Sequence, residues 1–106
     1  MTKEDKENLK SKRFTESLLF SCLKKCETEI DANLYRNKKW NNHYPGMYMY
    51  EVEQWKEYRA AIRSLLLGRY PLNKIIQKSK GWEHTASKNE VEAVVGLIKE
   101  NDFVLV

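Results

Sequence analysis

The chain has 106 residues, of which 42% are hydrophobic and 32% are charged, and its formal net charge at pH 7 is +4. This length indicates one domain with a modest core and excludes a large catalytic cleft between two domains. No apolar run approaches the roughly 18 residues of a membrane-spanning helix, and the mixed-charge start MTKEDKENLKSKRF lacks the apolar centre of a signal peptide. We therefore expect a cytoplasmic protein with no membrane partner.

The first expected helix runs from Leu9 to about Leu34, after a charged and flexible N-terminal segment at residues 1–8. At about 100° per residue, one broad sector of this helix collects its apolar side chains: Leu18, Leu19, Cys22, Leu23, Cys26, Ile30 and Leu34. The opposite side collects the polar residues Arg13, Ser17, Lys24 and Glu27. Phe20 falls among the polar positions, and we expect it to contact the end of the core or an interface rather than to act as a functional exposed ring.

A break is expected at residues 35–46, with the sequence YRNKKWNNHYPG. The pairs Asn41-Asn42 and Pro45-Gly46 are typical of turns, and Tyr44 is disfavoured in a helix because a proline follows it. We expect this segment to be the loop between two long helices.

The second long helix is expected from Met47 to Leu67. Its apolar sector contains Val52, Trp55, Tyr58, Ile62, Leu65 and Leu66. Basic residues spaced three and four apart form a stripe at the border of this sector: Lys56, Arg59 and Arg63. Gly68 and Pro71 then predict the end of the helix.

Two shorter helices follow, at Leu72–Lys80 and Lys88–Glu100. The second begins with a capping box, because Ser87 can cap the first turn while Glu90 reaches back to the cap amide. The apolar segment Phe103–Val106 closes the chain, and it can pack on the core, pair as a short strand or bind a partner.

These elements predict a mainly α fold. We expect a small helical bundle of three to four helices in a single domain at residues 9–106, with a short C-terminal strand as one of the open outcomes. The low content of glycine and proline agrees with long helices rather than a turn-rich β fold.

The residue types do not assemble into a recognisable catalytic or metal site. Cys22 and Cys26 lie in the apolar sector, which favours buried and inert thiols in a reducing compartment. His43 and His84 are far apart in the sequence, unlike the paired histidines of a zinc finger. Gly-rich phosphate loops and hydrolase motifs are missing. We therefore expect no enzymatic activity, no metal and no cofactor.

Positive charge and aromatic rings are concentrated in the middle of the chain. From Arg36 to Lys80 there are ten Lys or Arg and three Glu, a net charge of +7. Seven of the twelve aromatic side chains lie between Tyr35 and Tyr58. Cations beside flat rings suit acidic, planar or phosphate-bearing partners.

This pattern predicts a partner-binding surface made by Arg36, Lys38, Lys39, Trp40, Lys56, Arg59 and Arg63. Arg, Tyr and Trp are the residue types most enriched at binding hot spots, so the leading hypothesis is a small non-enzymatic binding protein. It would mask a surface of a larger partner, which is an acidic protein or complex or one that handles nucleic acid. Direct nucleic-acid binding and association with copies of itself are alternative uses of the same surface.

The segment Gln54–Leu65, QWKEYRAAIRSL, resembles the Trp-x-x-Tyr-Arg-x-x-Leu-Arg segment of phage tail-fibre assembly chaperones. The resemblance covers a dozen residues and implies a phage setting, without assigning a function to any residue. The small size of the chain and its many Lys and Asn residues agree with that setting. We expect a phage-type accessory, host-takeover or anti-defence factor, with a phage assembly or oligomeric structural protein as the alternative.

Overall fold

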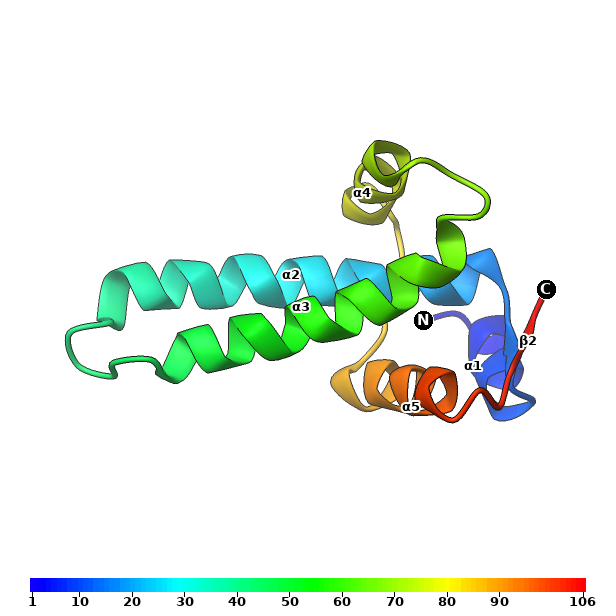
Figure 1. Cartoon of the computed structure of the whole chain (residues 1–106), viewed down its shortest axis with the longest axis horizontal. Helices are drawn as coiled ribbons and strands as arrows, with labels where there is room; N and C mark the ends of the chain where they lie inside the picture. The colour runs from blue at the N-terminus through cyan, green and yellow to red at the C-terminus, as the bar shows by residue number, and fades with distance from the viewer.

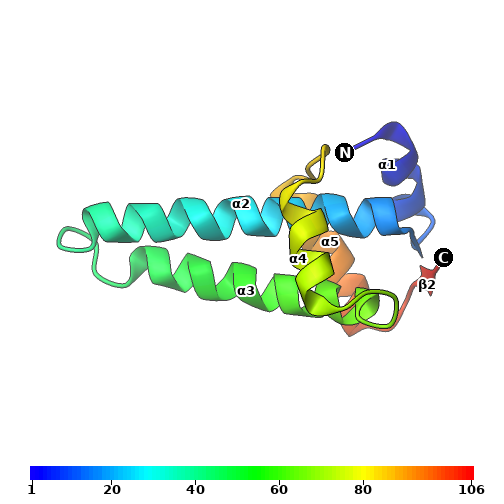
Figure 2. The same ribbon diagram turned by 90° about the horizontal axis from the view of Figure 1, so that it is seen from above.

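The computed structural model describes all 106 residues and contains five helices and two short strands. In chain order they are α1 (Lys3–Lys10), β1 (Arg13–Phe14), α2 (Glu16–Trp40), α3 (Met47–Leu66), α4 (Leu72–Lys80), α5 (Lys88–Lys99) and β2 (Val104–Leu105) (Figure 1). The long helices α2 and α3 form an antiparallel hairpin. One end of the hairpin is covered by α4 on one side and α5 on the other, with α1 close by, and the other end extends freely (Figures 1 and 2). The mainly α class is confirmed, but the predicted three to four helices are too few.

The first expected helix is divided into two helices, so the prediction of one helix from Leu9 to Leu34 was wrong. Ser11 caps α1, and Lys12 has a left-handed backbone with a φ of 59°. The chain then restarts at Thr15, whose side chain accepts a hydrogen bond from the Leu18 N–H at the beginning of α2. The N-cap at Thr15 therefore sets where α2 begins, although the helical spacing of apolar residues continues through this stretch.

The segment 1–8, expected to be flexible, instead contributes most of α1. The Thr2 side chain caps the first turn by accepting a hydrogen bond from the Asp5 N–H, and the Asp5 residue is only 2% exposed. The Asp5 carboxylate accepts a hydrogen bond from the Ser17 hydroxyl at 3.1 Å. This contact fastens α1 to the first turn of α2.

The C-terminal apolar segment forms a short strand, which confirms one of its expected outcomes. β2 pairs in parallel with β1, so that Arg13 lies opposite Val104 and Phe14 opposite Leu105. The rings of Phe14 and Phe103 stack with their centroids 4.8 Å apart. The partner strand, at the break after α1, was not predicted.

The loop of the hairpin is shorter than expected, because α2 continues through residues 35–40 to Trp40. Lys, Arg and Tyr at these positions are polar or aromatic, but none of them breaks a helix. The loop occupies residues 41–46, and α3 begins after Gly46, whose φ of 77° is left-handed. The expected bounds of α3, α4 and α5 agree with the structure to within one residue, and the capping box at Ser87 is present.

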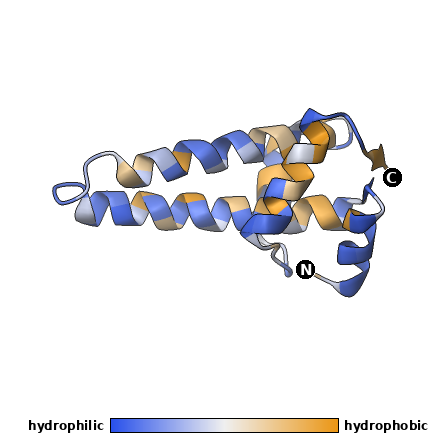
Figure 3. Ribbon diagram, turned by 90° about the horizontal axis from the view of Figure 1, so that it is seen from below, coloured by the Kyte–Doolittle hydropathy of each residue, from blue (hydrophilic) through white to orange (hydrophobic).

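The core lies where α4 and α5 cover the hairpin, and Figure 3 shows apolar residues gathered there. Phe20 is fully buried in this core. Its ring stacks on Trp82 at 5.0 Å between centroids and meets the edge of Tyr70 at 6.1 Å. The predicted core contact of Phe20 is therefore confirmed.

Candidate binding surface

The structure divides the predicted binding residues between two places on the hairpin. Arg36, Lys38, Lys39 and Trp40 lie together on the last turns of α2, near its free end. Lys56, Arg59 and Arg63 lie farther along, in the middle and last part of α3. At about 1.5 Å per residue, the step from Met47 to Arg59 alone is about 18 Å along the helix. Arg59 and Arg63 therefore lie well away from the loop end of the hairpin.

The free end of the hairpin, residues 34–50, is an exposed basic and aromatic surface, which we call the hairpin tip. None of its residues is buried, and it contains no Asp or Glu, so that Arg36, Lys38 and Lys39 leave it strongly cationic. Its exposed large apolar side chains are Leu34, Tyr35, Trp40, Tyr44, Met47 and Tyr50. Tyr35 and Tyr50 are exposed to 65% and 69%, so these rings are available to a partner.

The rings of the hairpin tip contact one another in a row that crosses the loop. Ring centroids are 5.9 Å apart between Trp40 and His43, 6.5 Å between His43 and Tyr44, and 6.4 Å between Tyr44 and Tyr48. The Lys39 ammonium lies 5.2 Å from the centroid of the Trp40 ring, within the range of a cation–π contact. The row therefore presents flat rings next to a positive charge.

The local backbone explains how this row forms. The Trp40 carbonyl, at the end of α2, accepts hydrogen bonds from the N–H groups of both His43 and Tyr44, at 2.9 and 3.0 Å. These bonds fold the chain back on itself and bring His43 and Tyr44 beside Trp40. The left-handed Gly46 then redirects the chain into α3.

Arg59 and Arg63 do not form the open basic stripe expected from the sequence. Both donate hydrogen bonds to the same Oε1 atom of Glu27, at 3.1 Å from Arg59 and 2.8 Å from Arg63. The Glu27 side chain is only 7% exposed, which corrects its expected place on the polar side of the first helix. Burial, and then the neighbouring Arg59, lower the pKa of Arg63, and its Nε atom is buried without a partner.

Lys56 has a different environment from the two arginines. It is half-exposed, and its ammonium lies 3.9 Å from the Glu53 carboxylate, one turn earlier on α3. Such an exposed pair contributes little to stability. Lys56 is therefore accessible, but it lies outside the acid-free hairpin tip.

Cys22 and Cys26 are free, buried thiols, as predicted. Burial raises the pKa of Cys26 to about 12 and raises that of Cys22 well above its usual value. The thiolate forms are thus very rare near pH 7. No group of three His, Cys, Asp or Glu side chains is arranged to hold a metal ion, and the surface has no pocket.

Sequence reasoning missed two groups of residues that shape this surface. Met47, Tyr48 and Tyr50 were assigned to a helix without a binding role, although the run MYMY shows no helical apolar pattern. Glu27 was taken as a solvent-facing acid. Its position next to the apolar sector, opposite a basic stripe on the other helix, was the signal for an ion pair.

No family model, curated protein or solved structure matches this chain. None of its helices combines the length and the apolar composition that crossing a bilayer requires.

Proposed function

We propose that this chain is a small non-enzymatic binding protein whose hairpin tip docks on an acidic surface of a larger protein. The observation that carries the proposal is the hairpin tip itself, an acid-free surface of cations and rings on which no residue is buried. Arg, Trp and Tyr dominate binding hot spots, and a cationic patch selects an acidic one. Arg36, Lys38, Lys39 and Trp40 are the residues expected to contact the partner.

The exposed apolar side chains support a docking role. Six large ones lie within a segment of 17 residues, from Leu34 to Tyr50. Such a concentration of exposed apolar side chains on a small protein marks an interaction site. Tyr and Trp also bury a large area for a small loss of side-chain freedom, because only two torsions are fixed.

The biological setting is part of the proposal. We propose a cytoplasmic phage-type accessory, host-takeover or anti-defence factor that masks a surface of a partner handling nucleic acid. The small size, the Lys and Asn content and the local resemblance of Gln54–Leu65 support a phage setting. Two free thiols suit a reducing compartment.

Within that resembling segment, the side chains have structural roles in this fold. Trp55 and Tyr58 are buried in the core, and Arg59 and Arg63 bind Glu27. Association of two tips in a dimer or phage assembly is disfavoured, because three unpaired cations on each tip repel one another.

The test is capture of proteins from a host lysate, with and without nuclease treatment, using three immobilised forms of the chain. They are the unmodified protein, the tip variant Lys38→Glu/Lys39→Glu and the control Lys3→Glu/Lys6→Glu, which makes the same charge change on exposed positions of α1. We expect the same partner with the unmodified protein and the control, and its loss with the tip variant.

Two results would contradict the proposal. Equal capture by the tip variant would show that the hairpin tip is not the contact surface. Loss of capture on nuclease treatment would instead favour the alternative in which Trp40 and Tyr44 stack on bases of a bound nucleic acid.

A further inference from the structure

A second basic surface lies on α4, away from the hairpin tip. Residues 58–82 contain six Lys or Arg and no Asp or Glu. The three arginines of this segment are all paired with carboxylates, Arg59 and Arg63 with Glu27 and Arg69 with Glu16. The three lysines Lys74, Lys78 and Lys80 remain, all on α4, and none of them lies within ion-pair distance of a carboxylate.

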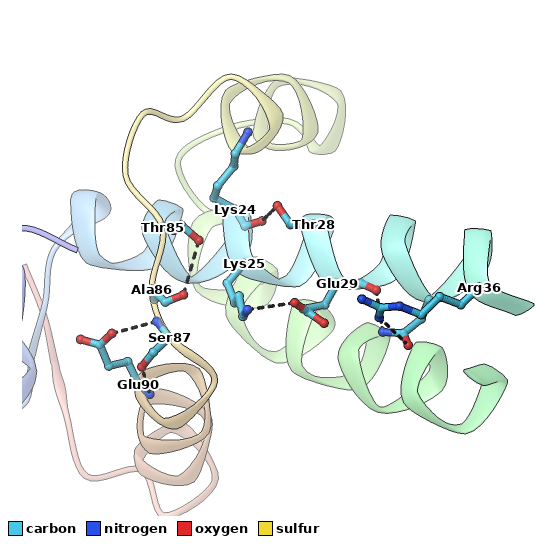
Figure 4. A network of polar contacts seen from close by, with 10 residues as sticks. Lys24, Lys25, Thr28, Glu29, Arg36, Thr85, Ala86, Ser87 and Glu90 are labelled. Carbon is cyan, nitrogen blue, oxygen red and sulfur yellow. Dashed lines mark hydrogen bonds and ion pairs between the residues drawn. The ribbon is translucent and has the colours of Figure 1, made fainter. Parts of the chain in front are cut away.

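Lys24 adds a fourth positive charge to this surface. Figure 4 shows its side chain reaching from α2 toward α4, where its ammonium donates a hydrogen bond to the Lys80 carbonyl at 2.6 Å. Lys78 is positioned by two aromatic rings. Its ammonium lies 5.6 Å from the Phe20 ring centroid and 5.3 Å from that of Tyr70. Two of the four lysines are therefore oriented by the fold itself.

The outer face of α4 is polar throughout. At about 100° per residue, Asn73, Lys74, Gln77 and Lys80 share one side of the helix. All four are exposed. From Lys74 to Lys80 the helix rises about 9 Å, a length over which duplex DNA carries about five phosphate charges. Side-chain amides such as those of Asn73 and Gln77 commonly donate to phosphate oxygens, between the contacts that lysines make.

We propose that the outer face of α4, with Lys24, is a contact surface for the phosphate backbone of a nucleic acid. Lys74 and Lys80 bind phosphates directly, and Lys24 and Lys78 add to the local positive potential. This surface is distinct from the hairpin tip and goes beyond the proposed docking on an acidic protein. It would let the chain bind a protein and the nucleic acid that this protein handles at the same time.

The residue types favour nucleic acid over the other polyanions. The outer face of α4 carries lysines and amides but no arginine and no ring, and lysine is depleted in protein interfaces. A membrane-surface helix inserts its apolar face between lipids. Most of the apolar face of α4 is occupied, because Ile75 is fully buried against the hairpin and Ile76 is half-buried, so that only Leu72 remains exposed. A charged backbone with no sequence requirement is the partner that fits best.

The test is fluorescence anisotropy with a labelled single-stranded oligonucleotide and the matching duplex, over a series of sodium chloride concentrations. The two direct phosphate contacts of Lys74 and Lys80 predict that the logarithm of the binding constant falls with the logarithm of the salt concentration, with a slope of about −1.4 for single strands. The variant Lys74→Gln/Lys80→Gln should bind more weakly and flatten the slope by about 1.4. The matched control Lys3→Gln/Lys6→Gln, on exposed positions of α1, should keep the affinity and slope of the unmodified protein.

Three results would overturn the inference: no binding at the lowest salt, equal losses in the two variants, or a loss confined to the α1 variant. Binding to vesicles of anionic lipid without binding to either oligonucleotide would also overturn it, in favour of a membrane contact. Far-UV circular dichroism should show the same helical content in all three proteins, because the four changed lysines are exposed. Tip-dependent capture of a protein partner is measured separately, so failure of either proposal leaves the other intact.

Discussion

The two ends of the α2–α3 hairpin are built from the same two helices, yet they differ in nearly every physical respect. At the covered end, Leu18, Leu19, Ile62 and Leu66 are fully buried under the other elements. At the hairpin tip no residue is buried and no acid offsets the three cations. The difference teaches that stability and recognition are separated along one hairpin, so substitutions at its two ends should have different consequences.

The change from one end to the other occurs around Glu27. The only side-chain hydrogen bonds between α2 and α3 are the two that Glu27 accepts. Nearer the tip, the residues of α2 that face α3 become polar: Asn33 is 4% exposed, and the Oδ1 atom of Asn37 is buried without a partner. The contact between α2 and α3 therefore becomes more polar toward the free end.

The largest loss of stability is expected at the covered end, from Phe20→Ala. Deleting a fully buried ring that contacts Trp82 and Tyr70 should lower the free energy of unfolding by about 4 kcal/mol. The change is measured by urea denaturation followed by circular dichroism. Tyr35→Ala on the hairpin tip is the matched control and should cost less than about 0.5 kcal/mol. Similar losses in the two variants would abolish the distinction between the two ends.

The next effect is expected from Glu27→Ala, which leaves two partly buried guanidinium groups facing each other without a carboxylate. Breaking such a cluster by removing one partner should cost about 3 kcal/mol. Because Cys26 lies one residue away and its thiol is buried, its reaction with a thiol reagent should also accelerate. Unchanged stability and labelling would mean that water screens the cluster. Restored stability in a variant that replaces all three charged residues by apolar ones would support the account.

A smaller, pH-dependent effect is expected from Tyr70→Phe, beside the first turn of α2. The Tyr70 hydroxyl donates to Glu16 Oε1 at 2.6 Å, and this bond, aided by Arg69, lowers the pKa of Glu16. A carboxyl group whose pKa is lower in the folded chain than in the unfolded chain stabilises the fold at pH values above the unfolded pKa of about 4.3. This contribution is lost as the pH falls through the pKa of the folded chain.

Tyr70→Phe should therefore reduce the difference in unfolding free energy between neutral pH and about pH 3. The measurement is urea denaturation at the two pH values. Glu16→Gln provides the control, because Tyr70→Phe should then leave the pH dependence of stability unchanged. A full pH effect in the single Tyr70→Phe variant would assign the acid sensitivity to other carboxylates.

The smallest effect on stability is expected at the hairpin tip. Trp40→Ala/Tyr44→Ala should change the free energy of unfolding by less than about 0.5 kcal/mol for each residue, since both rings are exposed. Amide hydrogen exchange should be faster at residues 34–50 than at the covered end of the hairpin. Protection of the tip amides equal to that of the core would show that the whole hairpin opens as one unit.

The elements that were predicted well are those whose ends are marked by local chemistry. Gly68 and Pro71 separate α3 from α4, and Ser87 with Glu90 starts α5. The N-terminal break at residues 11–15 was missed because helical periodicity continues through it. The strand β1 has two residues, too short for any alternating pattern, and it exists only through pairing with distant residues.

For the candidate binding surface too, the features set by local sequence were predicted and those set by distant residues were not. The acid-free composition of the hairpin tip is visible in the sequence, and Arg36, Lys38, Lys39 and Trp40 do lie together. The burial of Arg59 and Arg63 depends on which residue of α2 faces them. That pairing is a property of how the two helices are aligned, which neither helical pattern determines alone.

The pairing of β1 with β2 also bears on how the protein is made. Phe14, fully buried in the finished fold, has its stacking partner at Phe103, so about 90 residues separate them. Closing so long a loop is slow compared with forming a helix or a hairpin. During synthesis on the ribosome, α2 and α3 can therefore assemble before Phe103 is available to stack on the Phe14 ring. The strand β1 is then among the last elements to be secured, although it emerges before most of the chain.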